Sequence, residues 1–375
     1  MIVESIGYNK KRAIELLEKF KVDALIATTP VNVFYTTGIP TLHVAPNPIL
    51  YVLYNQYPSF SIITNDGEVF LLIWALYDSV EKFSWVKNYE RVGSPHAGLK
   101  LLKEKLELFE LKNKNIGIET LMPRYQSEFL QKEFPNASFV DGDNVFLEMR
   151  LIKSEEEIRR IKKSTQIAEK AIFNCIESVE KGISDNKLLQ IARRTIVNEG
   201  AEGWDHLTMN IGNSDPEAPG VGTIVEPGDM IRFDFGAVWK GYVSDVSREA
   251  VVGQVPEKGA KAMENMIKVQ EYCLDHLKPG ADPKELYNGA FKYYKQLGRG
   301  FCNIIGHSIG LETEESHIFG GGRIYNGPIK ENMVLDVEAW QNVRGQGLVG
   351  IEDCYRITSN GCERLSSLEK EIFVK

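Results

Sequence analysis

Two stretches in the C-terminal half of the chain alternate between apolar and polar residues with a period of two. In the first, apolar residues stand at 231, 233 and 235, and the alternation breaks at residues 239–241 before it resumes. The second spans residues 334–357 and is interrupted around Gly345. A period of two is typical of a half-buried strand, and an interruption that contains glycine is typical of a turn. The pattern therefore predicts two β-hairpins.

The first hairpin carries two aspartates. If its turn is centred between residues 239 and 240, Asp234 lies directly opposite Asp245. Cross-strand partners point to the same face, with Cβ atoms about 4.5–5.5 Å apart. Two carboxylates at that separation repel each other unless a cation or a shared proton lies between them. The alternative is a pair of ordinary surface aspartates on a solvated strand.

The second hairpin repeats this arrangement with glutamates. A turn centred on Gly345 places Glu338 opposite Glu352, and His307 lies between two glycines in the segment that separates the hairpins. Two Asp, one His and two Glu form a hard, mostly oxygen ligand set that suits a pair of divalent cations about 3.5–4 Å apart. The coincidence of the two hairpins favours a metal site over scattered surface acids.

The order of the predicted elements divides the chain into two domains. Strands and helices alternate through residues 1–150, with a second extended segment at 33–38 and a long loop at 41–58, which predicts an α/β domain with a mixed sheet. Ser154 fits a capping box at the start of a long helix. Helices followed by strands then occur twice in residues 151–375, which predicts an internally duplicated domain with the metal where its two sheets meet.

Composition narrows the class of protein. The chain has 375 residues, 43% of them hydrophobic and 26% charged, as in ordinary soluble proteins. A formal net charge of −8 argues against a nucleic-acid-binding protein. The chain contains no apolar run of about 18 residues and no signal-peptide pattern at its first residues, so neither a membrane span nor secretion is expected. Five scattered cysteines without zinc-site spacing indicate reduced thiols and a cytoplasmic protein.

At these motifs the chain resembles the aminopeptidase P, prolidase and creatinase superfamily. The matching segments are Asp234-Phe-Gly-Ala with Ser244-Asp245, Gly306-His307-Ser-Ile-Gly-Leu311, Val337-Glu338 and Ile351-Glu352-Asp353. The resemblance implies an α/β (α+β) protein with an N-terminal creatinase-like domain and a C-terminal, duplicated pita-bread domain. It also implies a homodimer that acts on a small peptide or amide.

The resemblance assigns residues to a metal centre as well. The five positions that hold two divalent ions (Mn, Co, Zn or Fe) in metal-dependent members are here Asp234, Asp245, His307, Glu338 and Glu352. Bridged cations lower the pKa of a bound water, so hydroxide is available near neutral pH to attack a carbonyl. By resemblance Glu338 is the catalytic residue that takes and returns the proton; the alternative is a purely structural ligand. Asp336 shares the face of Glu338 and is expected to contact the ligands from outside.

Three positions depart from the pattern of the peptidases. Glu217 and Glu314 stand where aminopeptidase P and prolidase carry histidines, and Gly350 stands where prolidases often carry arginine. His206 and His317 are close in sequence, either as replacements or as polar loop residues. With Glu217 and Glu314 in the substrate site, we expect weak hydrolysis of Xaa-Pro dipeptides.

Three functions remain open. The first is a metal-dependent hydrolase that resembles Xaa-Pro dipeptidase (prolidase) or aminopeptidase P. The second is a family member that, like creatinase, acts on another small C–N substrate, here one with a cation near the scissile bond. The third is a non-catalytic binding protein on the same fold, against which the five filled ligand positions argue.

Overall fold

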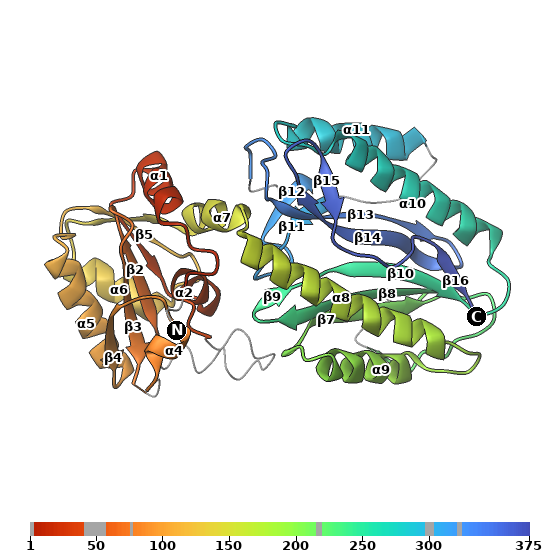
Figure 1. Ribbon diagram of the computed structural model, residues 1–375, viewed down its shortest axis with the longest axis horizontal. Helices are drawn as coiled ribbons and strands as arrows, with labels where there is room; N and C mark the ends of the chain where they lie inside the picture. The colour runs from red at the N-terminus through yellow and green to blue at the C-terminus, as the bar shows by residue number, and fades with distance from the viewer. Residues whose placement is uncertain (1–3, 41–57, 76–77, 215–219, 297–303, 321–324) are drawn as a thin grey trace. The chain divides into compact units, whose positions relative to one another are not determined.

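The computed structural model describes residues 4–40, 58–75, 78–214, 220–296, 304–320 and 325–375 (Figure 1). The chain divides into two compact units, residues 1–154 and residues 155–375. Within these described ranges, each unit contains one sheet. No helix in the described ranges combines the length and the apolar character needed to cross a membrane.

The N-terminal unit is built on a mixed sheet, as the sequence predicts. Within its described residues the sheet has six strands in the order β4-β3-β2-β1-β5-β6. The strands are β1 (Ala24–Ala27), β2 (Phe60–Thr64), β3 (Val69–Trp74), β4 (Asn88–Val92), β5 (Asn115–Ile118) and β6 (Ser138–Asp141). The central strand β1 pairs antiparallel with β2 and parallel with β5. The apolar core of this unit lies between the sheet and the helices that follow β4 and β5.

One helix of this unit contradicts the sequence prediction. The helices are α1 (Lys10–Phe20), α2 (Pro30–Thr37), α4 (Val80–Phe83), α5 (Pro95–Leu108), α6 (Arg124–Glu133) and α7 (Asp143–Leu151). Residues 33–38, predicted to be extended, form most of α2 and its C-cap. Thr29 caps this helix, Pro30 occupies its first turn, and Gly38 ends it at φ 78°. The loop predicted for residues 41–58 falls almost wholly outside the described residues.

The C-terminal unit is organised by a larger sheet. Its described residues form ten strands, seven of them in the order β12-β11-β13-β14-β10-β8-β7, with β9, β15 and β16 attached to β8, β14 and β10. The strands are β7 (Gly203–Ile211), β8 (Met230–Trp239), β9 (Tyr242–Val243), β10 (Val246–Val251), β11 (Ile304–Ser308), β12 (Ser316–Gly320), β13 (Val334–Val343), β14 (Gly347–Ile357), β15 (Cys362–Arg364) and β16 (Ile372–Val374). The two halves join where β10 pairs with β14. They therefore share one continuous sheet, which corrects the prediction of two separate sheets.

Helices cover one face of this sheet. They are α8 (Glu155–Ser178), α9 (Asp185–Asn198), α10 (Glu257–His276) and α11 (Pro283–Gln296). Figure 1 shows α8 and α9 along the strands β7 to β10, and α10 and α11 along β11 to β14. Ile231 and Phe233 of β8 lie in the core cluster that α8 and α9 also line. The alternate residues of β8, which include Asp234, point to the face of the sheet opposite these helices.

The predicted register is correct for the second hairpin and wrong for the first. In β13–β14 the turn is centred on Gly345, and Glu338 pairs with Glu352 as expected. In the first hairpin, however, Asp234 pairs with Ser247 and not with Asp245. The turn there is formed by Lys240 and Gly241, both at positive φ (51° and 81°), one residue later than predicted. That shift moves every cross-strand partner by two residues but keeps both aspartates on the same face.

Candidate metal centre

A single row of side chains crosses the face of the C-terminal sheet that lies opposite α8 and α9. Cα partners join Thr208 to Asp234, Asp234 to Ser247, Ser247 to Glu352, and Glu352 to Glu338 on five neighbouring strands. Cross-strand partners point to the same face of a sheet. The register alone therefore gathers three of the predicted acids on one surface.

Asp245 lies between two imidazoles. It follows β9, in the short irregular stretch before β10. Its Oδ1 is 3.2 Å from Nε2 of His206, and its Oδ2 is 3.8 Å from Nε2 of His307. His307, on β11, also places Nε2 at 3.5 Å from Oε1 of Glu352. The two oxygens of one carboxylate thus face two different groups of side chains.

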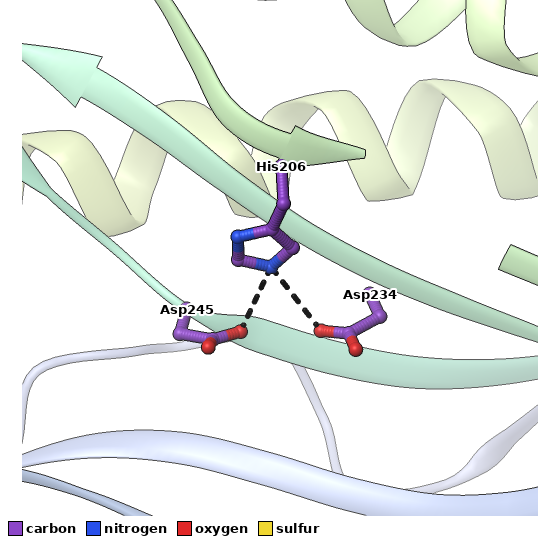
Figure 2. A group of neighbouring side chains, drawn as sticks. All are labelled: His206, Asp234 and Asp245. Atoms are coloured by element: carbon purple, nitrogen blue, oxygen red, sulfur yellow. Dashed lines mark ion pairs between the residues drawn. The ribbon is translucent and has the colours of Figure 1, made fainter. Parts of the chain in front are cut away.

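These groups have the composition of metal sites. In the described part of the chain, His206, Asp234 and Asp245 form one group and Asp245, His307 and Glu352 form another, each with its ligand atoms within 4.8 Å of one another. Figure 2 shows the first group, with Oδ1 of Asp234 at 3.5 Å from Nε2 of His206.

The buried oxygens test whether a cation suits this site. Oδ1 of Asp234 and Oδ1 of Asp245 are both buried and have no hydrogen-bond partner among the described residues. Buried polar atoms are rarely left in that state. Oxygen and imidazole ligands in two groups that share one carboxylate would satisfy these atoms by binding two divalent cations. The residues present therefore fit the metal pair.

The electrostatics of the site lead to the same conclusion. Burial and the nearby charge of Glu352 raise the pKa of Asp245 and of Glu338 well above their ordinary values. Burial lowers the pKa of His307, but Glu352 and other carboxylates outweigh it and raise that pKa overall. Without a cation these acids therefore retain protons that they would lose in water.

Arg232 contacts the site residues, although the sequence did not indicate it as one of them. It lies on β8 two residues before Asp234 and therefore on the same face. Its Nη1 is 2.8 Å from Oδ2 of Asp234, and its Nη2 is 4.0 Å from Oε2 of Glu352. Although burial raises it, the charge of Arg232 holds the pKa of Asp234 below its ordinary value. The alternation of β8 contained this signal, because position 232 shares the parity of 234.

Asp336 lies next to the second group. Its Cα partner on β11 is His307, its side chain is fully buried, and its pKa is raised well above the ordinary value by burial. Neither of its carboxylate oxygens has a hydrogen-bond partner in the ranges described. This is the neighbourhood in which the sequence places it, beside the ligands and outside their set.

The predicted substrate residues are less well defined. Glu217 lies outside the described residues. Glu314 is exposed, in the turn between β11 and β12. At Gly350 an added Cβ would lie 2.6 Å from Cβ of Trp340, so the tryptophan leaves no space for the arginine of the peptidase pattern. The prediction that Glu217 and Glu314 face the metal cavity stays a prediction.

Glu249 is a buried acid that borders this site. It lies on β10 with its Cα opposite that of Arg232, and its Oε1 accepts a hydrogen bond from the Gly350 amide at 3.0 Å. Burial raises the pKa of Glu249 to about 8, against the lowering effects of that amide and of the Arg232 charge. The native state therefore keeps a proton on Glu249 at pH values where an unfolded glutamate has lost it.

Glu249→Gln is expected to reduce the pH dependence of stability. Because the folded-state pKa is raised, the metal-free native state loses stability as pH rises from about 4.5 to about 8, by up to about 1.4 kcal/mol per pH unit. Glutamine does not ionise, so the free energy of unfolding of the variant should rise relative to that of the wild type as the pH increases across that window. Urea unfolding with a chelator at several pH values measures the difference. A constant difference, as expected for the exposed control Glu363→Gln, would contradict the assignment.

Comparison with known proteins agrees with this geometry. Residues 159–359 match the model of metallopeptidase family M24, and residues 10–152 match the creatinase/prolidase N-terminal domain. An Xaa-Pro dipeptidase of Pyrococcus horikoshii is 28% identical over 369 residues, which cover 96% of this chain and 97% of that protein.

Solved structures show the same fold. The prolidase from Pyrococcus horikoshii OT3 superposes with a TM-score of 0.80 at 27% identity, covering 97% of this chain and 99% of that one. The N-terminal domain of the FACT complex subunit SPT16 from chickpea matches with a TM-score of 0.74 at 17% identity over 96% of both chains, which shows the fold alone. Fold does not determine activity, but the M24 model covers more than half of the chain, including all five expected ligand positions. The chain therefore belongs to metallopeptidase family M24, with a creatinase/prolidase-type N-terminal domain.

Proposed function

We propose that this protein hydrolyses a C–N bond of a short peptide, of the Xaa-Pro dipeptide class, at a pair of divalent cations. The observation that carries the proposal is the carboxylate of Asp245, which turns one oxygen toward each of two ligand groups. Relatives named Xaa-Pro dipeptidase support the substrate class. The proposed ligands are Asp234, Asp245, His307, Glu338 and Glu352.

The bound cations supply Lewis-acid polarisation of the scissile carbonyl and a water acidic enough to react near neutral pH. The residues of the chain position this chemistry. Asp245 holds the two groups together through its two oxygens. Arg232 fixes Oδ2 of Asp234 and thereby fixes the direction of Oδ1.

Glu338 is the proposed proton carrier. Its Cα lies opposite that of Glu352, and burial together with the Glu352 charge raises its pKa. Once bound cations favour its ionised form, this carboxylate can take a proton from the attacking water and return it to the leaving nitrogen. Its position opposite Glu352 lets the same carboxylate serve as a ligand and carry the proton.

Arg232 makes the charge around the proposed ligands less negative than the sequence alone predicts. The glutamates at 217 and 314 suggest a preference for a cationic substrate, yet the buried Arg232 adds a positive charge that this expectation did not include. A substrate carboxylate near the site therefore meets less repulsion than the four acidic ligands alone would cause. This observation favours a dipeptide over a small cationic amide.

Metal-dependent turnover tests the proposal. The metal-free protein should be inactive on Xaa-Pro dipeptides and on small cationic amides, and Mn²⁺, Co²⁺, Zn²⁺ or Fe²⁺ should restore cleavage of the dipeptides. Glu338→Gln should lower kcat by roughly 10²–10⁴-fold, the usual contribution of a general acid–base. The exposed Glu363→Gln is the matched control. Dipeptide cleavage that survives metal removal, or a Glu338→Gln variant of normal kcat, would overturn the proposal.

The domain assignment and the assembly are further proposals. The division of the chain after Ser154 and the family matches that end at residue 152 and begin at residue 159 support domains at 1–150 and 151–375. α8 begins at Glu155, directly after Ser154, whose hydroxyl donates to the carbonyl of Ile6 at 2.6 Å. The homodimer rests on the family resemblance, and light scattering of the active protein checks it.

A further inference from the structure

His206 lies in the metal centre although it is not one of the five expected ligands. It belongs to β7, where the pairing with β8 shifts register between Trp204 and Leu207, so that the strand bulges at this histidine. An added Cβ at Gly236 would lie 2.6 Å from Cε1 of His206. The ring therefore packs on the glycine of the facing strand, with Nε2 directed at the two aspartates (Figure 2).

The other ring nitrogen is held by a carboxylate. Nδ1 of His206 lies 3.2 Å from Oδ2 of Asp205, and that same oxygen accepts a hydrogen bond from the hydroxyl of Thr313. A proton on Nδ1 leaves a lone pair on Nε2, the atom that faces Asp234 and Asp245. Histidines that bind metals almost always donate their other N–H to a carboxylate, a carbonyl or a water. His206 has this arrangement.

The distances around Nε2 are those between neighbouring ligands of one cation. Nε2 of His206 lies 3.2 Å from Oδ1 of Asp245 and 3.5 Å from Oδ1 of Asp234. Ligand atoms about 2.0–2.2 Å from a cation, at tetrahedral or octahedral angles, lie roughly 2.8–3.6 Å from each other. The two distances from Nε2 are therefore in the range for ligands of one divalent cation, and all three atoms lie within 4.8 Å of one another.

The partners of the four aspartate oxygens support a cation beside His206. Oδ2 of Asp234 binds Arg232, and Oδ2 of Asp245 faces His307. The remaining oxygens, Oδ1 of each, are buried and have no hydrogen-bond partner in the described part of the chain. The side chain of Asp245 is 9% exposed. If Nδ1 carries the ring proton, a cation beside Nε2 would satisfy both of these buried oxygens.

We propose that His206 is a ligand of the cation held by Asp234 and Asp245, so that each of the two cations joined by Asp245 has one imidazole. This inference rests on the metal centre of the proposed function. Imidazole suits Zn²⁺, Fe²⁺ and Ni²⁺ better than it suits Mn²⁺, whereas carboxylates suit Mn²⁺. Replacing His206 should therefore weaken binding of Zn²⁺ more than binding of Mn²⁺.

Metal titration of the full-length protein tests the assignment. Elemental analysis after equilibrium dialysis should find about two Co²⁺ or Zn²⁺ per wild-type chain, as in bridged two-metal sites, and about one in His206→Ala and His206→Gln. Competition with a chelator should show that the variants bind the second ion at least roughly 100-fold more weakly than the wild type does. Losing a residue that only hydrogen-bonds a ligand costs up to about 100-fold in metal affinity, and losing a ligand itself should cost at least as much. His276→Gln, at the exposed end of α10, is the matched control and should bind as the wild type does.

A measurement on the wild type tests the same assignment if the variants fold poorly. In the Co²⁺ form, proton NMR should show a strongly shifted, exchangeable signal for the Nδ1–H of His206, which is hydrogen-bonded to Asp205; its absence would count against ligation by Nε2.

The outcomes separate this inference from the proposed function. No metal binding by the wild type would refute the metal centre itself. Two tightly bound ions in every variant would refute only the role of His206. Tighter binding in His206→Ala than in the wild type would show that His206 is a cation competing with the metal, which also overturns the inference.

Discussion

Asp245→Asn is expected to abolish both metal binding and turnover, the largest effect of any single substitution in the site. Asp245 contributes to both ligand groups, with Oδ1 near His206 and Oδ2 near His307. An amide has nearly the same size but no charge, and its nitrogen cannot bind a cation, so one substitution weakens both sites. Losing several kcal/mol of Lewis-acid stabilisation corresponds to roughly 10³-fold or more in kcat/KM.

The same substitution should stabilise the metal-free protein. Burial and the charge of Glu352 raise the pKa of Asp245, so this group costs stability when no cation is bound. With a chelator present, Asp245→Asn should therefore unfold at a higher temperature than the wild type, while added metal should stabilise only the wild type. Asp275→Asn, on the exposed end of α10, should change neither property. A variant with normal metal content would show that Asp245 does not join the two groups.

Arg232→Met is expected to destabilise the metal-free C-terminal unit by about 3–5 kcal/mol, the usual cost of removing one partner from a buried ion pair. Methionine fills much of the space of arginine but leaves Asp234 as an uncompensated buried charge. The charge of Glu352, which also acts on Arg232, then repels Asp234 with no arginine between them. Amide hydrogen exchange of β8 and β10 in the presence of a chelator measures this loss within the unit.

Metal should rescue much of the Arg232→Met defect, because a cation at Oδ1 of Asp234 compensates the charge that arginine no longer neutralises. The stabilisation by metal should thus be larger in the variant than in the wild type. Arg159→Met is the control, since Arg159 pairs with Glu156 at the surface and exposed pairs contribute about 0–1 kcal/mol. Equal destabilisation with and without metal would show that Arg232 acts through packing and not through the charge of Asp234.

The two hairpins show how far sequence reasoning extends. The register of β13–β14 followed from one glycine, because Gly345 at φ 88° marks the centre of its turn. The predicted register of the first hairpin was wrong because its turn includes Lys240, which adopts φ 51° before Gly241 although lysine has no strong turn preference. A shift of one residue in the turn moves the partners by two, so the acids stayed on the predicted face.

Buried and bulged segments were harder to predict. All eight residues of α2 are buried, so the helix lacks the polar stripe that would identify it, and the Thr29-Pro30 start signal was the one available indication. His206 could not be placed in the site, because its direction depends on a bulge in β7 and on the space above Gly236 in the facing strand. Such contacts between strands depend on tertiary packing that local periodicity does not encode.

Anomalous diffraction from crystals grown with Zn²⁺ or Co²⁺ tests the central claim most directly. We expect two peaks about 3.5–4 Å apart on either side of Asp245, the usual separation of a bridged metal pair. One peak should lie against Asp234 and the other against His307 and Glu352. A single peak that does not contact Asp245, or no peak within reach of these side chains at saturating metal, would contradict a two-cation hydrolytic centre.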